Sequence, residues 1–131
     1  MQIHGFDHFN IRCRPAEVPA LVGFYKDLLG LTEGRRPNFP FPGAWLYADP
    51  ARPAVLHIAA TLPDDAPDPD ASLPTGRFDH ISFKVSGVDS LCAKLDARGI
   101  EYRDTPVPGW PLRQMFFRDP AGVKLEFTYD A

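Results

Sequence analysis

The sequence predicts an α+β fold built from two βαβββ modules that form an open, cupped, mixed sheet. Three observations support this prediction. Motifs of the first half return in the second half, each half contains one helical pattern among strand-like segments, and a glycine ends each helical pattern. The clearest recurring motifs are Phe6-Asp7-His8 with Phe78-Asp79-His80, and Asp49-Pro50 with Asp119-Pro120.

The first half begins with an alternating segment at 6–12, which predicts a strand. Residues 17–29 place apolar side chains at helical spacing, and Gly30 supplies the stop. Further strands are predicted at 31–36, 44–48 and 54–60.

The second half repeats this order. A strand is predicted at 78–86 and a helix at 88–98, ended by Gly99. The remaining strands are predicted at 101–105, 112–117 and 123–129. Each half therefore reads as one βαβββ module.

The chain is expected to be a single domain of 131 residues, a common domain size. Module one is predicted at 1–61 and module two at 77–131. Residues 62–76 are rich in proline and aspartate and lack periodicity, which indicates an extended linker.

Composition limits the classes of function. With 44% hydrophobic and 24% charged residues the chain is typical of a soluble globular protein. A net charge of −3 does not suggest a nucleic-acid partner. No apolar run is long enough to predict a membrane span, and residues 5–10 do not resemble a signal peptide. The two cysteines predict no disulfide framework, so we expect a cytoplasmic protein.

Four potential metal ligands fall on the polar faces of the predicted strands: His8, His57, His80 and Glu126. Imidazole and carboxylate suit nickel, zinc, cobalt, manganese or iron, and two histidines with one carboxylate leave positions open for substrate. The repeat symmetry favours His8, His80 and Glu126 as ligands. His57 is a fourth ligand, an outer hydrogen-bond donor or a general base.

Two longer motifs carry a resemblance to a known family. They are Phe24-Tyr25-Lys26-Asp27-Leu28-Leu29-Gly30-Leu31 and Phe117-Arg118-Asp119-Pro120-Ala121-Gly122-Val123-Lys124-Leu125-Glu126. Together with the paired modules and the His/His/Glu set, they make the chain resemble the vicinal oxygen chelate superfamily. That group includes glyoxalase I, methylmalonyl-CoA epimerase, extradiol dioxygenases, fosfomycin-resistance thiol transferases and bleomycin-resistance proteins.

The resemblance is greatest to glyoxalase-I-like proteins. It implies a metal-dependent lyase or isomerase that acts on a small oxygen-rich substrate through a metal-chelated enediolate. Glu126 or His57 would then move the proton. The resemblance also implies a homodimer and makes glutathione a candidate cosubstrate.

Other residues are candidates for contact with the substrate. Gln114 and Phe116 share one strand face, and Gln114 could donate a hydrogen bond. Trp45 is either a pocket wall or a core residue. Arg113, with Arg35 and Arg36, is a candidate for receiving an anionic group.

Two alternatives stay open. An Fe(II) extradiol-type dioxygenase would use the same ligands. However, its motif has tyrosine where this chain has Phe116, and no further histidine lies between His80 and Glu126. A non-catalytic binding protein of the bleomycin-resistance type, which sequesters a small molecule, would bind without turnover and keep its affinity after chelation.

Overall fold

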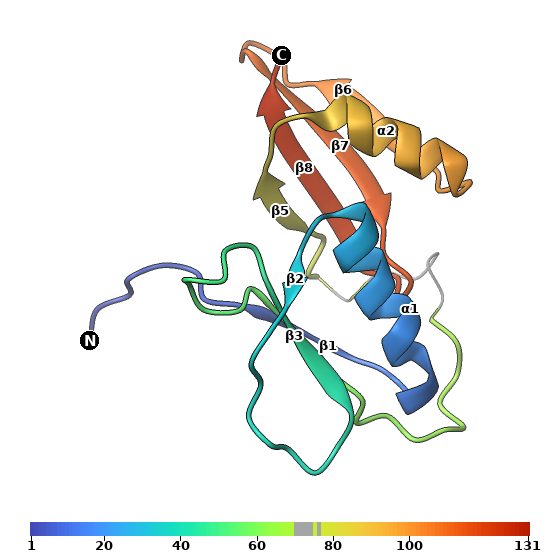
Figure 1. The fold of residues 1–131 in the computed structure, drawn as a ribbon. Coiled ribbons are helices and arrows are strands. Elements are labelled where there is room, and N and C mark those ends of the chain that lie inside the picture. Colours follow the sequence, from blue (N-terminus) through green and yellow to red (C-terminus); the bar gives the residue numbers. More distant parts are fainter. Residues whose placement is uncertain (70–74, 76) are drawn as a thin grey trace. The chain divides into compact units, whose positions relative to one another are not determined.

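The computed structural model describes residues 1–69, 75 and 77–131, and it forms two compact units, Met1–Asp68 and Pro69–Ala131 (Figure 1). The linker predicted at 62–76 includes the boundary between these units. Residues 70–74 and 76 of that linker lie outside the described residues.

The first unit contains one helical segment and four strands. The elements are β1 (Phe9–Arg12), a 3₁₀ turn (Pro15–Glu17), α1 (Val18–Gly23), a π-helical turn (Phe24–Leu28), β2 (Thr32–Glu33), β3 (Gly43–Tyr47) and β4 (Leu56–Ala59). The strands form one sheet in the order β1-β4-β3-β2, in which β1 and β4 are parallel and the other pairs antiparallel.

The helix expected at 17–29 therefore exists, but it changes its pitch along its length. It begins with a 3₁₀ turn at Pro15, where the Glu17 carboxylate accepts the backbone N–H of Arg14 at 2.7 Å. Gly23 ends the α-helical part, and the π-helical turn follows. Gly30 then takes a positive φ of 72° and stops the helix as predicted.

The second unit has the same order of elements. They are β5 (Ile81–Lys84), α2 (Val88–Ala97), β6 (Arg103–Pro106), β7 (Leu112–Arg118) and β8 (Lys124–Asp130). The sheet order is β5-β8-β7-β6, again with one parallel pair, β5 with β8. The predicted α+β class with two βαβββ modules is confirmed, and each module forms an open four-stranded mixed sheet.

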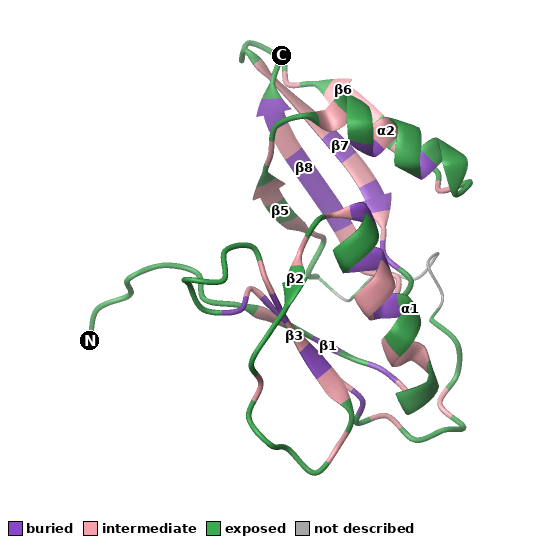
Figure 2. Ribbon diagram, in the orientation of Figure 1, coloured by how far each residue is buried: buried purple, intermediate pink, exposed green. Residues whose placement is uncertain are grey.

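Each sheet buries one face and leaves the other more accessible. In the first unit Leu56 and Ile58 of β4 are buried, whereas His57 between them is half-buried. In the second unit the buried residues run along β7 and β8, including Met115 and Leu125 (Figure 2). Full burial of such a side chain stabilises a fold by about 1.5–3 kcal/mol.

The two sheets also have equivalent registers. Asn10 lies opposite His57 in the parallel pair of the first unit, and Ser82 lies opposite Glu126 in that of the second. Trp45 and Phe116 are the next residues in these two rows. The sequence repeat is therefore a structural repeat that places His57 and Glu126 at corresponding positions.

One detail of the prediction needs correction. Strands β1 and β5 begin at Phe9 and Ile81, so both are shorter than the segments expected at 6–12 and 78–86. His8 and His80 lie one residue before their strands, and each is flanked on its N-terminal side by an aspartate. Among the residues that the structure describes, no helix is long and apolar enough to cross a membrane.

Candidate functional site

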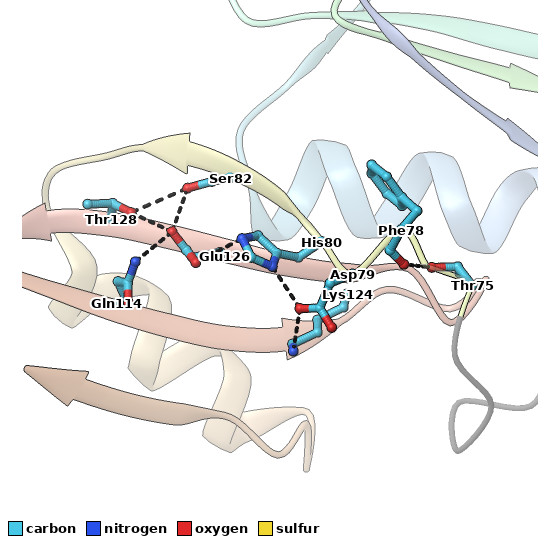
Figure 3. A network of polar contacts seen from close by, with 9 residues as sticks. All are labelled: Thr75, Phe78, Asp79, His80, Ser82, Gln114, Lys124, Glu126 and Thr128. Atoms are coloured by element: carbon cyan, nitrogen blue, oxygen red, sulfur yellow. Dashed lines mark hydrogen bonds and ion pairs between the residues drawn. The ribbon is translucent and has the colours of Figure 1, made fainter. Parts of the chain in front are cut away.

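The second unit brings together a histidine and a glutamate on the polar face of its sheet. His80 precedes β5, Glu126 lies on the neighbouring strand β8, and His80 Nε2 is 3.1 Å from Glu126 Oε2 (Figure 3). Glu126 is only 5% exposed, and it is one of the two buried charged or polar residues of the described chain. A buried carboxylate needs partners, because burial of an unpaired charge is costly.

Three donors hold the other oxygen of this carboxylate. Glu126 Oε1 accepts hydrogen bonds from Ser82 Oγ at 2.8 Å, Thr128 Oγ1 at 2.8 Å and Gln114 Nε2 at 3.0 Å. The donors come from β5, β8 and β7, so three strands fix one oxygen (Figure 3). Oε1 is fully engaged, and Oε2 is the oxygen that faces His80.

Asp79 and Lys124 orient the imidazole of His80. Asp79 Oδ2 lies 2.8 Å from His80 Nδ1 and also accepts a hydrogen bond of 2.8 Å from Lys124 Nζ. Lys124 first, and His80 second, lower the pKa of Asp79 from 3.8 to about 2. Because Asp79 occupies Nδ1, the ring presents Nε2 towards Glu126.

This arrangement fits a divalent metal ion. Metal-binding histidines commonly donate their second N–H to a carboxylate, and metal-binding carboxylates are themselves hydrogen-bonded. His80 has such a carboxylate in Asp79, and Glu126 has three donors on its outer oxygen. The two remaining donor atoms, one nitrogen and one oxygen, point at each other across 3.1 Å and suit iron, manganese, cobalt, nickel or zinc. Neither unit by itself gathers three histidine, cysteine or acidic side chains at one point within the described part of the chain.

The first unit presents two further histidines on the corresponding face of its own sheet. His8 Nδ1 lies 2.5 Å from Asp7 Oδ2, which repeats the Asp79–His80 contact. The His8 ring stacks on His57 at 3.8 Å, and the other face of His57 stacks on Trp45 at 3.9 Å with the two planes 2° apart. Both ring faces of His57 are thus covered.

Burial, and then the positive charge that His8 can carry, lower the pKa of His57 below 6.5. The lowered pKa favours the neutral imidazole, the form that can accept a proton or bind a metal. Among the described residues neither of its ring nitrogens has a hydrogen-bond partner, which leaves both roles open.

The residues predicted to contact substrate fall into two groups. Gln114 and Phe116 lie on the Glu126 face: Gln114 donates to Glu126, and the Phe116 ring meets His80 edge-on at 5.9 Å. Trp45 covers His57. Arg113 lies on the opposite face of β7, opposite Tyr129, and its charge is matched by Asp104, with Nε 3.1 Å from Oδ1.

A pocket of about 520 Å³ in the second unit contains basic residues that the sequence interpretation did not single out. Its lining includes Arg103, Phe116, Arg118 and Lys124. Ser82 and Thr128, which hold Glu126, were also missed as site residues. The alternation of side chains along the predicted strands at 112–117 and 123–129 places Thr128 and Lys124 on the face of Glu126, so that signal was available for these two residues.

Comparison with known proteins identifies the family. The model of the Glyoxalase/Bleomycin resistance protein/Dioxygenase superfamily matches residues 5–127. The chain belongs to this superfamily. The match includes all four of the predicted metal ligands, and it agrees with the resemblance that the two sequence motifs indicate. A search of curated proteins finds no match.

Solved structures of superfamily proteins share the fold over almost the whole chain. A glyoxalase family protein from Bacillus anthracis is 21% identical, with a TM-score of 0.72 over 100% of this chain and 98% of that one. A glyoxalase/dioxygenase from Nostoc punctiforme is 21% identical, with a TM-score of 0.72 over 98% and 92%. The fosfomycin resistance protein FosX from Listeria monocytogenes, as a mutant in complex with Mn(II) and 1S,2S-dihydroxypropylphosphonic acid, is 14% identical, with a TM-score of 0.71 over 99% and 95%.

Proposed function

We propose that this chain is a metal-dependent enzyme of the glyoxalase-I type, a lyase or isomerase that moves a proton on a small oxygen-rich substrate. The observation that carries the proposal is the contact of His80 Nε2 with Glu126 Oε2 at 3.1 Å, made while the other ring nitrogen of His80 and the other oxygen of Glu126 have partners elsewhere. Further partners hold both residues in place, as the ligands of a metal site are commonly held.

The proposed ligands are His8, His80 and Glu126. Support for His8 comes from the repeat, because Asp7 and Asp79 contact the same ring nitrogen of the two histidines. Glu126 is better suited to ligation than to proton transfer, since three hydrogen bonds hold one of its oxygens in place. A bound divalent ion would act as a Lewis acid and make the substrate easier to deprotonate.

His57 is the proposed proton carrier, with a role as fourth ligand as the alternative. Its stacked neighbours fix the plane of the ring, and both nitrogens are free of protein hydrogen bonds in the described chain. A positioned general base of this kind typically contributes about 10²–10⁴-fold to a rate. Gln114 holds Glu126, and Phe116 and Trp45 supply apolar walls beside the two polar faces.

Turnover in D₂O tests the proposed reaction. Nickel-, zinc- or cobalt-loaded protein is incubated with methylglyoxal, and proton NMR follows the appearance of lactate without glutathione and of the lactoyl thioester of glutathione when glutathione is present. We expect turnover, and we expect that His57→Phe, which keeps the ring stack but removes the nitrogens, lowers kcat by at least about 10²-fold.

Two other results would redirect the assignment. Uptake of oxygen with a catechol by the iron-loaded protein would indicate the dioxygenase alternative. Binding of an oxygen-rich compound without turnover, at an affinity that survives a chelator, would indicate the sequestering protein. A homodimer also stays a prediction, and the mass of the protein in solution tests it.

A further inference from the structure

We propose that Arg103 and Arg118 form a subsite for an oxyanion group, a carboxylate or a phosphonate, on the substrate. The subsite lies in the pocket of the second unit, beside the ring of Phe116. The inference that this anionic group belongs to the substrate rests on the proposed function. The binding of an anion to the two arginines does not depend on that function.

Strand registers place this subsite on the same sheet face as Glu126. Arg103 of β6 lies opposite Phe116 of β7, which lies opposite Glu126 of β8. Cross-strand partners share a face, so the three side chains form one row across the sheet. Arg118 and Lys124 form a second row, two residues further along the same strands.

The charges around the pocket are unequal. Its lining holds three cations, Arg103, Arg118 and Lys124, but one acid, Glu101. Lys124 is already matched by Asp79 at 2.8 Å. Within the described residues neither Arg103 nor Arg118 has a carboxylate partner, so their positive charge is available to a ligand.

Both guanidinium groups keep N–H donors that an oxyanion can use. The Cζ atom of Arg103 lies 5.2 Å from the centre of the Phe116 ring, an arrangement that supports the guanidinium while leaving its N–H groups free. Arg118 uses one nitrogen, Nη1, to donate to the carbonyl of Gly122 at 2.8 Å, which anchors the group and leaves further donors. Guanidinium forks bind carboxylates and phosphonates through paired hydrogen bonds.

The position of Phe116 relates the subsite to the proposed metal ligands. The guanidinium of Arg103 lies over the Phe116 ring, and the centre of the same ring lies 5.9 Å from the centre of the His80 ring. Two strand spacings separate Arg103 from Glu126, roughly 10 Å at the backbone. A molecule that reaches both groups is small, carries oxygens at one end and bears a negative charge at the other. The inferred class of substrate is a small oxygenated carboxylate or phosphonate.

Titration with matched anionic and neutral probes tests the inference. Lactate and methylphosphonate are the anionic probes, and lactamide is the neutral counterpart of lactate. Each is added to the ¹⁵N-labelled full chain after treatment with a chelator, so that lactate cannot bind through a metal ion, and the shifts of the Arg103, Phe116 and Lys124 amides report binding. The same titrations are made on Arg103→Gln and on Arg98→Gln, an exposed arginine of the same unit that loses the same charge.

We expect both anions to bind at these amides, and lactamide to bind at least about tenfold more weakly than lactate. Arg103→Gln should weaken the binding of the anions about tenfold, and Arg98→Gln should leave it unchanged. Equal affinity for lactate and lactamide, no saturable binding of either anion, or equal affinity in Arg103→Gln would overturn the inference. Failure of the proposed function would instead appear as a protein that takes up no metal or shows no turnover, and it would leave these titrations of the metal-free protein unaffected.

Discussion

Replacement of Gln114 by methionine tests whether the donors around Glu126 prepare it for a metal. Gln114→Met keeps the length of the side chain but removes the hydrogen bond of 3.0 Å to Glu126 Oε1. Ser82 and Thr128, both at 2.8 Å, still hold that oxygen, so the carboxylate should be loosened rather than released.

The size of the effect follows from the type of hydrogen bond. Hydrogen bonds to charged groups contribute about 1.5–3 kcal/mol. Gln114 is half-buried, so water can partly replace its amide, and the lower end of the range applies. We expect the free energy of unfolding to fall by about 1.5 kcal/mol and the metal affinity to fall about tenfold.

Urea denaturation of the metal-free protein gives the free energy of unfolding, and competition with a chromogenic chelator gives the metal affinity. Thr105→Val is the matched control: Thr105 lies opposite Gln114 on β6, and the change preserves its shape. The control should alter both quantities little. If Gln114→Met bound metal as tightly as the unchanged protein, the idea that this donor set positions Glu126 would be refuted.

Three further predictions concern single side chains. The lowered pKa of His57 means that the unfolded chain takes up its proton more readily than the folded one, so the free energy of unfolding should fall as pH drops below 6.5. His57→Phe should flatten that part of the curve, and an unchanged slope would contradict the reasoning. Asp79, with its pKa lowered to about 2, stabilises the fold above pH 3.8 and loses this effect as pH falls through about 2. In Lys124→Met, carboxyl NMR of the metal-free protein should show the Asp79 midpoint moving up towards 3.8, whereas Lys94→Met should leave it in place. Asp119 is buried and accepts the backbone N–H groups of Ala121 and Val123 at 2.8 and 2.9 Å, so Asp119→Ala should cost at least about 2 kcal/mol in urea denaturation. Asp49 is its counterpart in the first unit, is exposed and accepts the backbone N–H of Ala51. Asp49→Ala should therefore lower the free energy of unfolding by less, and an equal loss in the two variants would argue against burial as the cause.

The fold was predictable because local patterns and the repeat agree with each other. Alternation located all eight strands, and the positive φ of Gly30 and Gly99 explains why both helical patterns end there. Strand ends were less predictable, because they depend on pairing with a distant strand. β1 starts at Phe9 only where Leu56 is opposite, which leaves His8 just outside the strand.

The contact between His80 and Glu126 was predictable from the sequence, but the contacts that support these two residues were not. His80 and Glu126 could be expected to meet because the repeat makes their strands neighbours. The contact of Lys124 with Asp79 depends on side-chain reach across strands, which no local pattern reveals. Arg113 could have been set apart from Gln114 by alternation alone, since adjacent strand residues point to opposite faces.

The anion subsite shows the same limit of sequence reasoning. Arg103 and Arg118 lie fifteen positions apart on different strands, and only the antiparallel register of β6 with β7 brings Arg103 opposite Phe116. Whether an arginine is matched by an acid is likewise a property of the folded chain. Arg113 is paired with Asp104, whereas Arg103 has the Phe116 ring.

Metal content tests the central claim most directly. Elemental analysis is made on gently purified protein and on the double variant His80→Ala, Glu126→Ala, each before and after incubation with divalent ions. We expect about one transition-metal ion per chain in the unchanged protein, since each chain has one His80–Glu126 pair, and we expect the variant to lose it. An unchanged protein that takes up no metal under either condition, or a variant that retains it, would contradict the claim that His80 and Glu126 are metal ligands.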